Sequence, residues 1–183
     1  MSRVMRAIAA IAVLAGVFAS PASLEATGDK LPVAGGESHC VVFVEGQRPD
    51  GELVLSRPEC FTDEASADFR AWHGLTEVKS ESSLAGEVGV YATSSTFTLG
   101  RHYDGFNGTG SSIRIVGSSC TGGFWNTSST WDNRISSSYN GCSQLKHWDL
   151  PYKSGTVEST YGAGTTDNLG YMNNRTESVS YHS

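Results

Sequence analysis

The chain has 183 residues, of which 17% are charged, and its formal net charge at pH 7 is −6. This length accommodates one ordinary domain or two very small ones. The acidic balance argues against a nucleic-acid partner, because phosphate contacts need lysine and arginine. It suits a cation or a basic partner surface instead. Glycine is abundant, with 21 residues, and proline is scarce, with 5, which favours many short strands joined by tight turns.

Residues 1–22 have the pattern of a cleaved signal peptide. Arg3 and Arg6 precede an unbroken apolar run at 7–19, and the small residues at 20–22 follow it. The run is shorter than the roughly 20 apolar residues that a membrane span needs, although an N-terminal anchor helix is the alternative. We therefore predict a secreted, extracellular protein that has no membrane association after signal cleavage. Without Arg3 and Arg6, the 13 basic residues become 11 against 19 acidic ones, a net charge of −8.

All four cysteines, Cys40, Cys60, Cys120 and Cys142, follow the predicted signal. In an exported chain an even number of cysteines predicts disulfides. The spacing favours the local pairs Cys40–Cys60 and Cys120–Cys142, although other connectivities are open. Each local pair would close a loop of about 20 residues and stabilise the fold by about 3 kcal/mol. Zinc binding is the alternative, but no C-x-x-C pair supports it.

The N-terminal part of the mature chain is expected to contain one hairpin and one helix. In chain order we expect a flexible leader (23–36), a strand (39–45), a Pro-Asp-Gly turn (49–51), a strand (52–55), a helix (62–72) and a polar linker (74–87). Cys40 and Cys60 can join the ends of the hairpin, and Thr62 is expected to cap the helix. Phe69 and Trp72 share a helix face, which we interpret as a packing face. This segment is a propeptide, a clamp on the rest of the chain or a small partner-binding piece.

Short β-prone segments separated by glycines make up the rest of the chain. Examples are Val88–Tyr91, Thr96–Leu99, Ser112–Val116 and Thr156–Tyr161. Short strands with frequent turns are typical of a β-sandwich.

The C-terminal part contains an internal repeat. His102-Tyr103-Asp104-Gly105-Phe106 in the first copy matches His147-Trp148-Asp149-Leu150-Pro151-Tyr152 in the second. Each copy continues with a glycine, Gly108 or Gly155, and then a β run. The copies close on Asp132-Asn133-Arg134-Ile135-Ser136-Ser137 and Asn173-Asn174-Arg175-Thr176-Glu177-Ser178, which lie 41 residues apart. Two four-strand units of this kind predict a pair of Greek keys that bury an apolar face against each other.

These motifs resemble those of the βγ-crystallin-like family, including its secreted microbial members. That family has an aromatic-x-Gly hairpin and a closing motif of Asn/Asp, Asn/Asp, two variable residues, Ser/Thr and Ser in each Greek key. The motif at 132–137 fits all four defined positions, and the motif at 173–178 fits three, with Glu177 where Ser or Thr is expected. Phe106-Asn107-Gly108 fits the hairpin pattern, whereas the stretch 152–155 has one extra residue.

The resemblance covers residues 88–183 and departs from the family at two further positions. Arg101 and His147 stand where an aromatic residue usually precedes the hairpin. The resemblance implies an all-β fold of two Greek-key motifs forming a βγ-crystallin-like sandwich. A small disulfide-bearing hairpin and a short helix, within residues 37–87, would precede this domain.

The resemblance also implies that the closing motifs bind Ca²⁺. Calcium takes six to eight oxygen ligands from side chains, carbonyls and water. The first site would use Asp132 or Asn133, the carbonyl of Arg134 and the hydroxyl of Ser136; the second would use Asn173 or Asn174, the carbonyl of Arg175 and Glu177. The alternative is that these Asx and Ser side chains only cap turns.

A second hypothesis is a secreted inhibitor of metalloproteases or a toxin-like binding protein, whose target is a secreted protease or another protein. The stretch 120–127 could form an exposed loop tethered by Cys120, with Phe124 and Trp125 as its aromatic anchor. The alternative is that Trp125 and Trp131 fill the sandwich core.

We do not expect an enzyme. The five histidines show no H-E-x-x-H spacing, and no G-x-S-x-G motif occurs. His102 and Asp104 recur as His147 and Asp149, and recurrence at equivalent positions favours a structural role. The two aspartates are expected to accept backbone N–H bonds in the hairpin turns.

Overall fold

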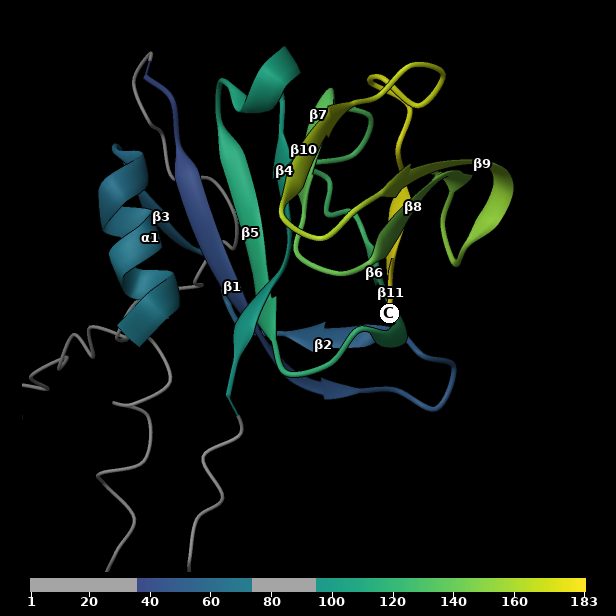
Figure 1. Ribbon diagram of the computed structural model, residues 1–183, viewed down its shortest axis with the longest axis horizontal. Helices are drawn as coiled ribbons and strands as arrows, with labels where there is room; N and C mark the ends of the chain where they lie inside the picture. The colour runs from purple at the N-terminus through teal and green to yellow at the C-terminus, as the bar shows by residue number, and fades with distance from the viewer. Residues whose placement is uncertain (1–35, 74–94) are drawn as a thin grey trace, which may run out of the picture. The chain divides into compact units, whose positions relative to one another are not determined.

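The computed structural model describes residues 36–73 and 95–183, and strands dominate this part of the chain (Figure 1). The elements are β1 (His39–Gln47), β2 (Leu53–Leu55), β3 (Glu59–Phe61), α1 (Glu64–His73), β4 (Phe97–Tyr103), the 3₁₀ turn η1 (Phe106–Gly108), β5 (Ser112–Gly117), β6 (Thr121–Asn126), β7 (Ser137–Asn140), β8 (Gln144–Leu150), β9 (Ser154–Tyr161), β10 (Thr165–Asn168) and β11 (Ser178–His182). Within these two ranges, the prediction of a mostly β fold with one α-helix is confirmed. The predicted signal (1–22), the leader up to residue 35, the linker (74–87) and the strand at 88–91 lie outside the described residues.

The strands form two sheets that exchange strands between the two repeat copies. One sheet has seven strands in the order β10-β7-β4-β5-β1-β2, with β3 also paired to β1, and the other has four strands in the order β6-β11-β8-β9. In each copy the first two strands form an antiparallel hairpin, and the fourth strand pairs with the first. The third strand, β6 or β10, joins the sheet of the other copy. Neither sheet is therefore complete without both copies.

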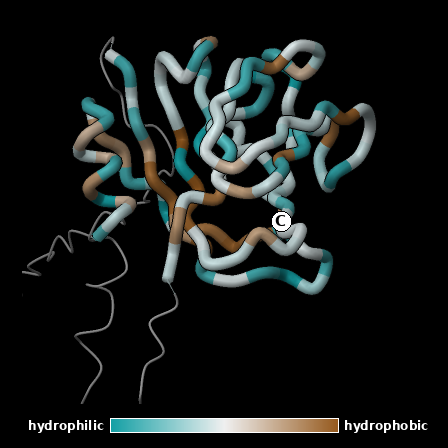
Figure 2. Tube along the Cα trace, viewed as in Figure 1, coloured by the Kyte–Doolittle hydropathy of each residue, from teal (hydrophilic) through white to brown (hydrophobic). Residues whose placement is uncertain are grey.

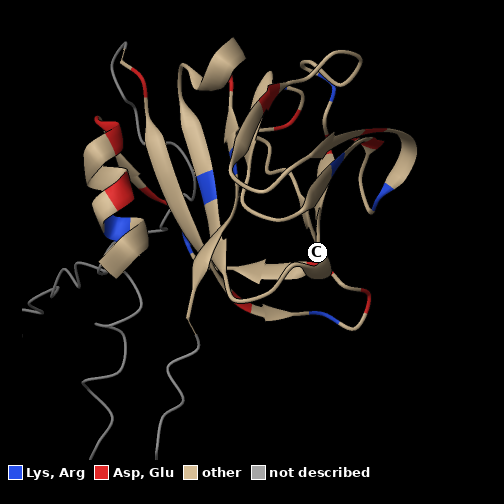
Figure 3. Cartoon of the chain, viewed as in Figure 1, with Lys and Arg blue, Asp and Glu red and all other residues tan. Residues whose placement is uncertain are grey.

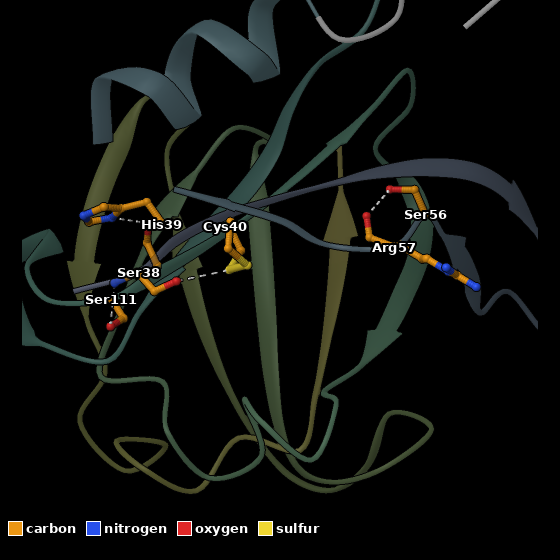
Figure 4. The surroundings of a disulfide bond; sticks show 8 residues. Ser38, His39, Cys40, Ser56, Arg57 and Ser111 are labelled. Atoms are coloured by element: carbon orange, nitrogen blue, oxygen red, sulfur yellow. Dashed lines mark hydrogen bonds between the residues drawn. A yellow bond between two sulfur atoms is a disulfide. The ribbon is translucent and has the colours of Figure 1, made fainter. Parts of the chain in front are cut away.

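The N-terminal segment belongs to the seven-stranded sheet. β1 and β2 form the predicted hairpin, and β1 also runs parallel to β5, with Val42 opposite Ile115. The disulfide Cys40–Cys60 joins β1 to β3, where these two residues face each other across the strand pair (Figure 4). Beside it, Ser38 N donates to Ser111 Oγ at 3.2 Å, which ties the start of β1 to the chain just before β5. The parallel pairing was not foreseen from the sequence.

Helix α1 covers the outer face of the seven-stranded sheet. Its Ala67 packs in a small core with Val41, Phe43 and Val116, which alternate with the residues that face the second sheet. The helix begins two residues later than predicted, because Asp63 is the capping side chain, not Thr62. Asp63 Oδ1 accepts the N–H of Ser66 at 2.8 Å, and this bond lowers the pKa of Asp63.

Ion pairs anchor α1 to the sheet. Figure 3 shows acidic positions along α1 and basic positions on the neighbouring strands. The buried Arg101 on β4 pairs with Glu64 and with Asp68, the latter at 3.4 Å, and Arg114 on β5 also pairs with Asp68. This position explains why Arg101 stands where an aromatic residue was expected, because a guanidinium here meets the acidic face of the helix. The predicted packing role of Phe69 and Trp72 is wrong, since these side chains are 67% and 85% exposed.

The main core lies between the two sheets, and hydrophobic stretches of β1 and β5 border it (Figure 2). Ile113 and Ile115 of one sheet pack in the same cluster as Leu145 and Val179 of the other. The disulfide Cys120–Cys142, the second predicted pair, is part of this cluster, so both local pairings are confirmed. Burying such apolar side chains stabilises the fold by about 2 kcal/mol each.

Candidate metal-binding site at the paired closing turns

The two folded hairpins have matching backbone conformations at positions that lie 45 residues apart. Asp104 and Asp149 lie at the start of the turns, and Gly110 and Gly155 lie at the end, with φ of 80° and 78°. A Cβ at either glycine would overlap the carboxylate of its aspartate. Gly155 therefore corresponds to Gly110, and the predicted match with Gly108 is wrong.

The left-handed residues of the two turns follow the same correspondence. Asn107 and Gly108 have φ of 57° and 70°, and Tyr152 and Lys153 have φ of 58° and 57°. Lys153 thus adopts the conformation for which the first turn uses a glycine. Counting from Asp104 and Asp149, the aromatic Phe106 corresponds to Pro151, so the extra residue inferred from the sequence does not exist.

The last serine of each closing motif holds its own hairpin. Ser137 Oγ donates to the carbonyl of Gly105 at 2.6 Å and accepts the N–H of Gly108 at 3.0 Å. Ser178 Oγ does the same with Leu150, at 2.8 Å, and Lys153, at 3.1 Å. This explains physically why a serine occupies the final position of both motifs.

The aspartates hold the turns in two different ways. Asp149 Oδ1 accepts the backbone N–H of Thr156 at 2.6 Å, as predicted. For Asp104 the prediction is wrong: its Oδ2 accepts from Arg134 Nη2 at 2.7 Å. Arg175 lies at the equivalent place, 3.8 Å from Asp149. Both motif arginines therefore turn their side chains towards the hairpins.

The two closing turns lie against each other. Asn133 and Asn174 both have φ of 54°, and each donates its backbone N–H to the opposite turn. Asn133 N bonds the carbonyl of Thr176 at 3.1 Å, and Asn174 N bonds the carbonyl of Ile135 at 2.9 Å. The two motifs thus form one reciprocal pair and not two separate loops.

Oxygen atoms from both motifs meet at this pair. Ser136 Oγ donates to Asn174 Oδ1 at 3.3 Å, so the hydroxyl of the first motif lies beside the amide of the second. Asn173 Oδ1 is buried and has no hydrogen-bond partner in the described part of the chain. Within the same residues, the carbonyls of Arg134 and Arg175 accept no hydrogen bond.

Thr127 positions two of the remaining predicted ligands. Its backbone N–H and its hydroxyl both bond the carbonyl of Glu177, at 2.9 and 3.0 Å, and the hydroxyl lies 3.5 Å from Asp132 Oδ1. Glu177 N donates to the carbonyl of Trp148 at 2.8 Å. Residues 36–73 and 95–183 contain no group of three or more His, Cys, Asp or Glu side chains that could hold a metal. The oxygens here come from amides, hydroxyls and carbonyls instead, which are calcium-type donors.

A buried polar network crosses the core between the sheets. Ser138 Oγ lies 2.8 Å from His102 Nδ1 and 2.9 Å from His147 Nε2, and the Tyr181 hydroxyl lies 3.1 Å from His102 Nε2. These contacts form a consistent chain of hydrogen bonds when both imidazoles are neutral. The Tyr181 hydroxyl donates to His102, the His102 N–H donates to Ser138, and the Ser138 hydroxyl donates to His147. Burial lowers the pKa of His102 well below its ordinary value and lowers that of His147 to about 3. The recurrence of both histidines in the sequence predicted a structural role for them, whereas nothing in the sequence marked Ser138 and Tyr181 as their partners.

The predicted aromatic anchor is wrong. Residues 121–126 form strand β6 instead of an exposed loop, and Phe124 and Trp125 are only 2% and 6% exposed. Trp125 and Trp131 belong to the core, which was the alternative interpretation. Phe124 lies on the other face of β6, under Lys153 Nζ, which sits 4.6 Å from the ring centre.

No family model, no curated protein and no solved structure matches this chain. None of the helices in the described ranges is long and apolar enough to cross a membrane.

Proposed function

We propose that this protein is a secreted calcium-binding protein of βγ-crystallin-like architecture, in which Ca²⁺ stabilises the fold. The observation that carries the proposal is the contact between the two closing motifs, where Ser136 Oγ and Asn174 Oδ1 are 3.3 Å apart. The role is binding and structural stabilisation; we propose no enzymatic reaction.

The strand order supports the architecture. In each copy the hairpin strands and the fourth strand share a sheet while the third strand crosses to the other sheet, which is the connectivity expected of two interlocked Greek keys. The repeated Asp–Gly pairs and hairpin-binding serines support the same interpretation. In the Greek-key interpretation, β1 to α1 is an addition that extends one sheet and covers its outer face.

The donor set supports calcium. Ca²⁺ prefers six to eight oxygens, often including carbonyls and waters. The unpaired Asn173 Oδ1 and the free carbonyls of Arg134 and Arg175 are oxygens without another partner in the described chain. We propose that each ion is shared between the motifs, with Ser136 and Asn174 in one site and with Asn133 and Glu177 in the equivalent one.

The two disulfides and the N-terminal pattern support export, since disulfides persist in oxidising compartments. The inhibitor hypothesis loses its proposed contact residues, because Phe124 and Trp125 are buried.

Thermal unfolding of the mature, oxidised protein with Ca²⁺ and with chelator tests this proposal. Ca²⁺ at a hundredfold excess over Kd should stabilise the folded state by about 2.7 kcal/mol, which raises Tm by about 5–10 °C for a chain of this size. Ser136→Ala and Glu177→Ala, one substitution in each proposed site, should reduce the rise. Ser143→Ala, the same chemical change at an exposed position outside the turns, should leave it unchanged. No rise in wild-type Tm at millimolar Ca²⁺ would reduce the motifs to turn-capping elements.

A further inference from the structure

The outer face of the four-stranded sheet carries a set of side chains that the calcium proposal does not use. We name this set the β8 face: Gln144, Lys146 and Trp148 of β8, Val157, Ser159 and Tyr161 of β9, and Ser180 and His182 of β11. The strand registers place these residues side by side, with Lys146 opposite both Ser159 and Ser180. Residues that alternate with them, such as Leu145 and His147, are buried in the core. The β8 face therefore points away from the other sheet.

Lys146 is the second-copy counterpart of Arg101, at the same separation of 45 positions. Arg101 lies on the outer face of the seven-stranded sheet, where α1 provides Glu64 and Asp68 as its partners. On the β8 face no described carboxylate pairs with Lys146. The same position in the repeat is thus neutralised in one copy and left cationic in the other.

Two of the three unpaired cations in the described chain meet at this face. Arg57, Lys146 and Lys153 form no ion pair within residues 36–73 and 95–183, whereas the other arginines there do. Lys153 Nζ lies 4.6 Å from the centre of the Phe124 ring, and Phe124 pairs with Ser180, which pairs with Lys146 on its other side. Burial lowers the pKa of His182 at this face, and the charges of the two lysines lower it further. A net acidic protein therefore has a local positive surface here, which favours an anionic partner.

Most of the remaining side chains of the face are hydroxyl, amide and aromatic groups, and Val157 is aliphatic. Trp148 Nε1 donates to Ser180 Oγ at 3.3 Å, which fixes the indole against β11, and Tyr161 is 65% exposed. The side chains of Gln144 and Ser159 form no hydrogen bond in the described part of the protein, so they are free to bond a ligand. By contrast, the sheet face under α1 combines the apolar side chains of Val41, Phe43 and Val116 with arginines that pair with the carboxylates of the helix. The acidic helix suits that face, whereas a polyhydroxylated ligand suits the β8 face.

We propose that the β8 face, with Lys153 at its edge, binds an acidic polysaccharide whose sugars carry carboxylates. Lys146 and Lys153 pair with the carboxylates, Trp148 and Tyr161 lie against the faces of sugar rings, and Gln144 and Ser159 bond ring hydroxyls. This site is distinct from the closing turns and does not require calcium.

Calorimetric titration with a pentamer of galacturonate, at low ionic strength and in chelator, tests this site separately from the calcium proposal. We expect measurable binding that the neutral maltopentaose does not show. The double substitution Lys146→Gln and Lys153→Gln should weaken binding about tenfold or more, since two charge pairs are lost. Lys146→Gln alone should weaken it several-fold and, as a strand-surface change, keeps the test valid if the double variant is unstable.

Arg57→Gln is the matched control, because it removes the same charge from an exposed, unpaired arginine elsewhere. It should leave the affinity unchanged, whereas Tyr161→Ala should weaken binding of the galacturonate pentamer. Three results would each overturn the proposal: no binding of the pentamer at millimolar concentration, an equal loss of affinity in Arg57→Gln, or equal affinity for polyglutamate together with no effect of Tyr161→Ala.

Discussion

The buried pair of histidines predicts a steep loss of stability in mild acid. Both imidazoles lie at 0% exposure and are held neutral between the sheets. Burial lowers the pKa of His147 from 6.5 to about 3, and burial followed by the nearby charge of His147 lowers that of His102. The unfolded chain therefore binds protons that the folded protein cannot, and stability is lost as the pH falls below about 6.5.

The expected size of this effect follows from 1.36 kcal/mol per pKa unit. Between pH 7.5 and pH 5 each buried histidine should cost about 2 kcal/mol, so the pair should remove about 4 kcal/mol. The lowered pKa values of Glu59 and Asp63 act in a different window, because carboxylates titrate below about pH 4.5. The pKa of His182 is also lowered, but this residue is only partly buried, so it contributes a smaller loss of stability.

Urea unfolding at several pH values between 5 and 7.5 measures this loss directly. His147→Gln should lower the overall stability but reduce the slope of unfolding free energy against pH by about half. His73→Gln, on the exposed side of α1, is the control for loss of an imidazole outside the core. A flat stability profile from pH 7.5 to pH 5 would refute the neutral-network interpretation.

Two further predictions concern the turns and the disulfide. Gly155→Ala should lower the free energy of unfolding in urea by about 1 kcal/mol or more beyond the loss caused by Gly164→Ala. Both glycines have positive φ, but only a Cβ at 155 would meet a carboxylate, that of Asp149. Equal losses in the two variants would show that Asp149 does not constrain the turn. Replacing Cys120 and Cys142 together by Ala should lower the unfolding free energy by about 3 kcal/mol, as expected for a bridge between residues 22 apart; a loss below 1 kcal/mol would contradict its structural role.

Local patterns predicted the strands, the helix and both disulfides. The hairpin β1–β2 was recognisable because its turn chemistry and β-prone residues are contiguous in the chain. The correspondence of His102, Asp104 and the closing motif with their second copies was also visible, because repeats are compared directly in sequence. All these features involve residues that lie within about 45 positions of one another in the sequence.

Long-range pairings could not be predicted in the same way. The parallel contact of β1 with β5 joins residues more than 70 positions apart, and nothing in either strand specifies its partner. Arg101 appeared only as a departure from a motif, since its role depends on Glu64 and Asp68 of a distant helix. The approach of Ser136 to Asn174 likewise depends on how two turns meet.

The hairpin alignment failed for a more specific reason. Gly108 and Gly155 each come shortly after an aromatic residue, so they look equivalent in the sequence. In the structure the equivalent of Gly108 is Lys153, which also has positive φ although it is not a glycine. Residue type alone therefore concealed the equivalence of Gly110 and Gly155, which the Asp–Gly contacts reveal.

Diffraction from crystals of the mature protein grown with Ca²⁺ tests the calcium proposal most directly. We predict an ion at the paired closing turns. Its distance to Ser136 Oγ or Asn174 Oδ1 should be about 2.3–2.6 Å, which is typical of calcium ligands. Turns that keep the direct bond between Ser136 and Asn174 at saturating Ca²⁺, with no ion between the motifs, would contradict the account.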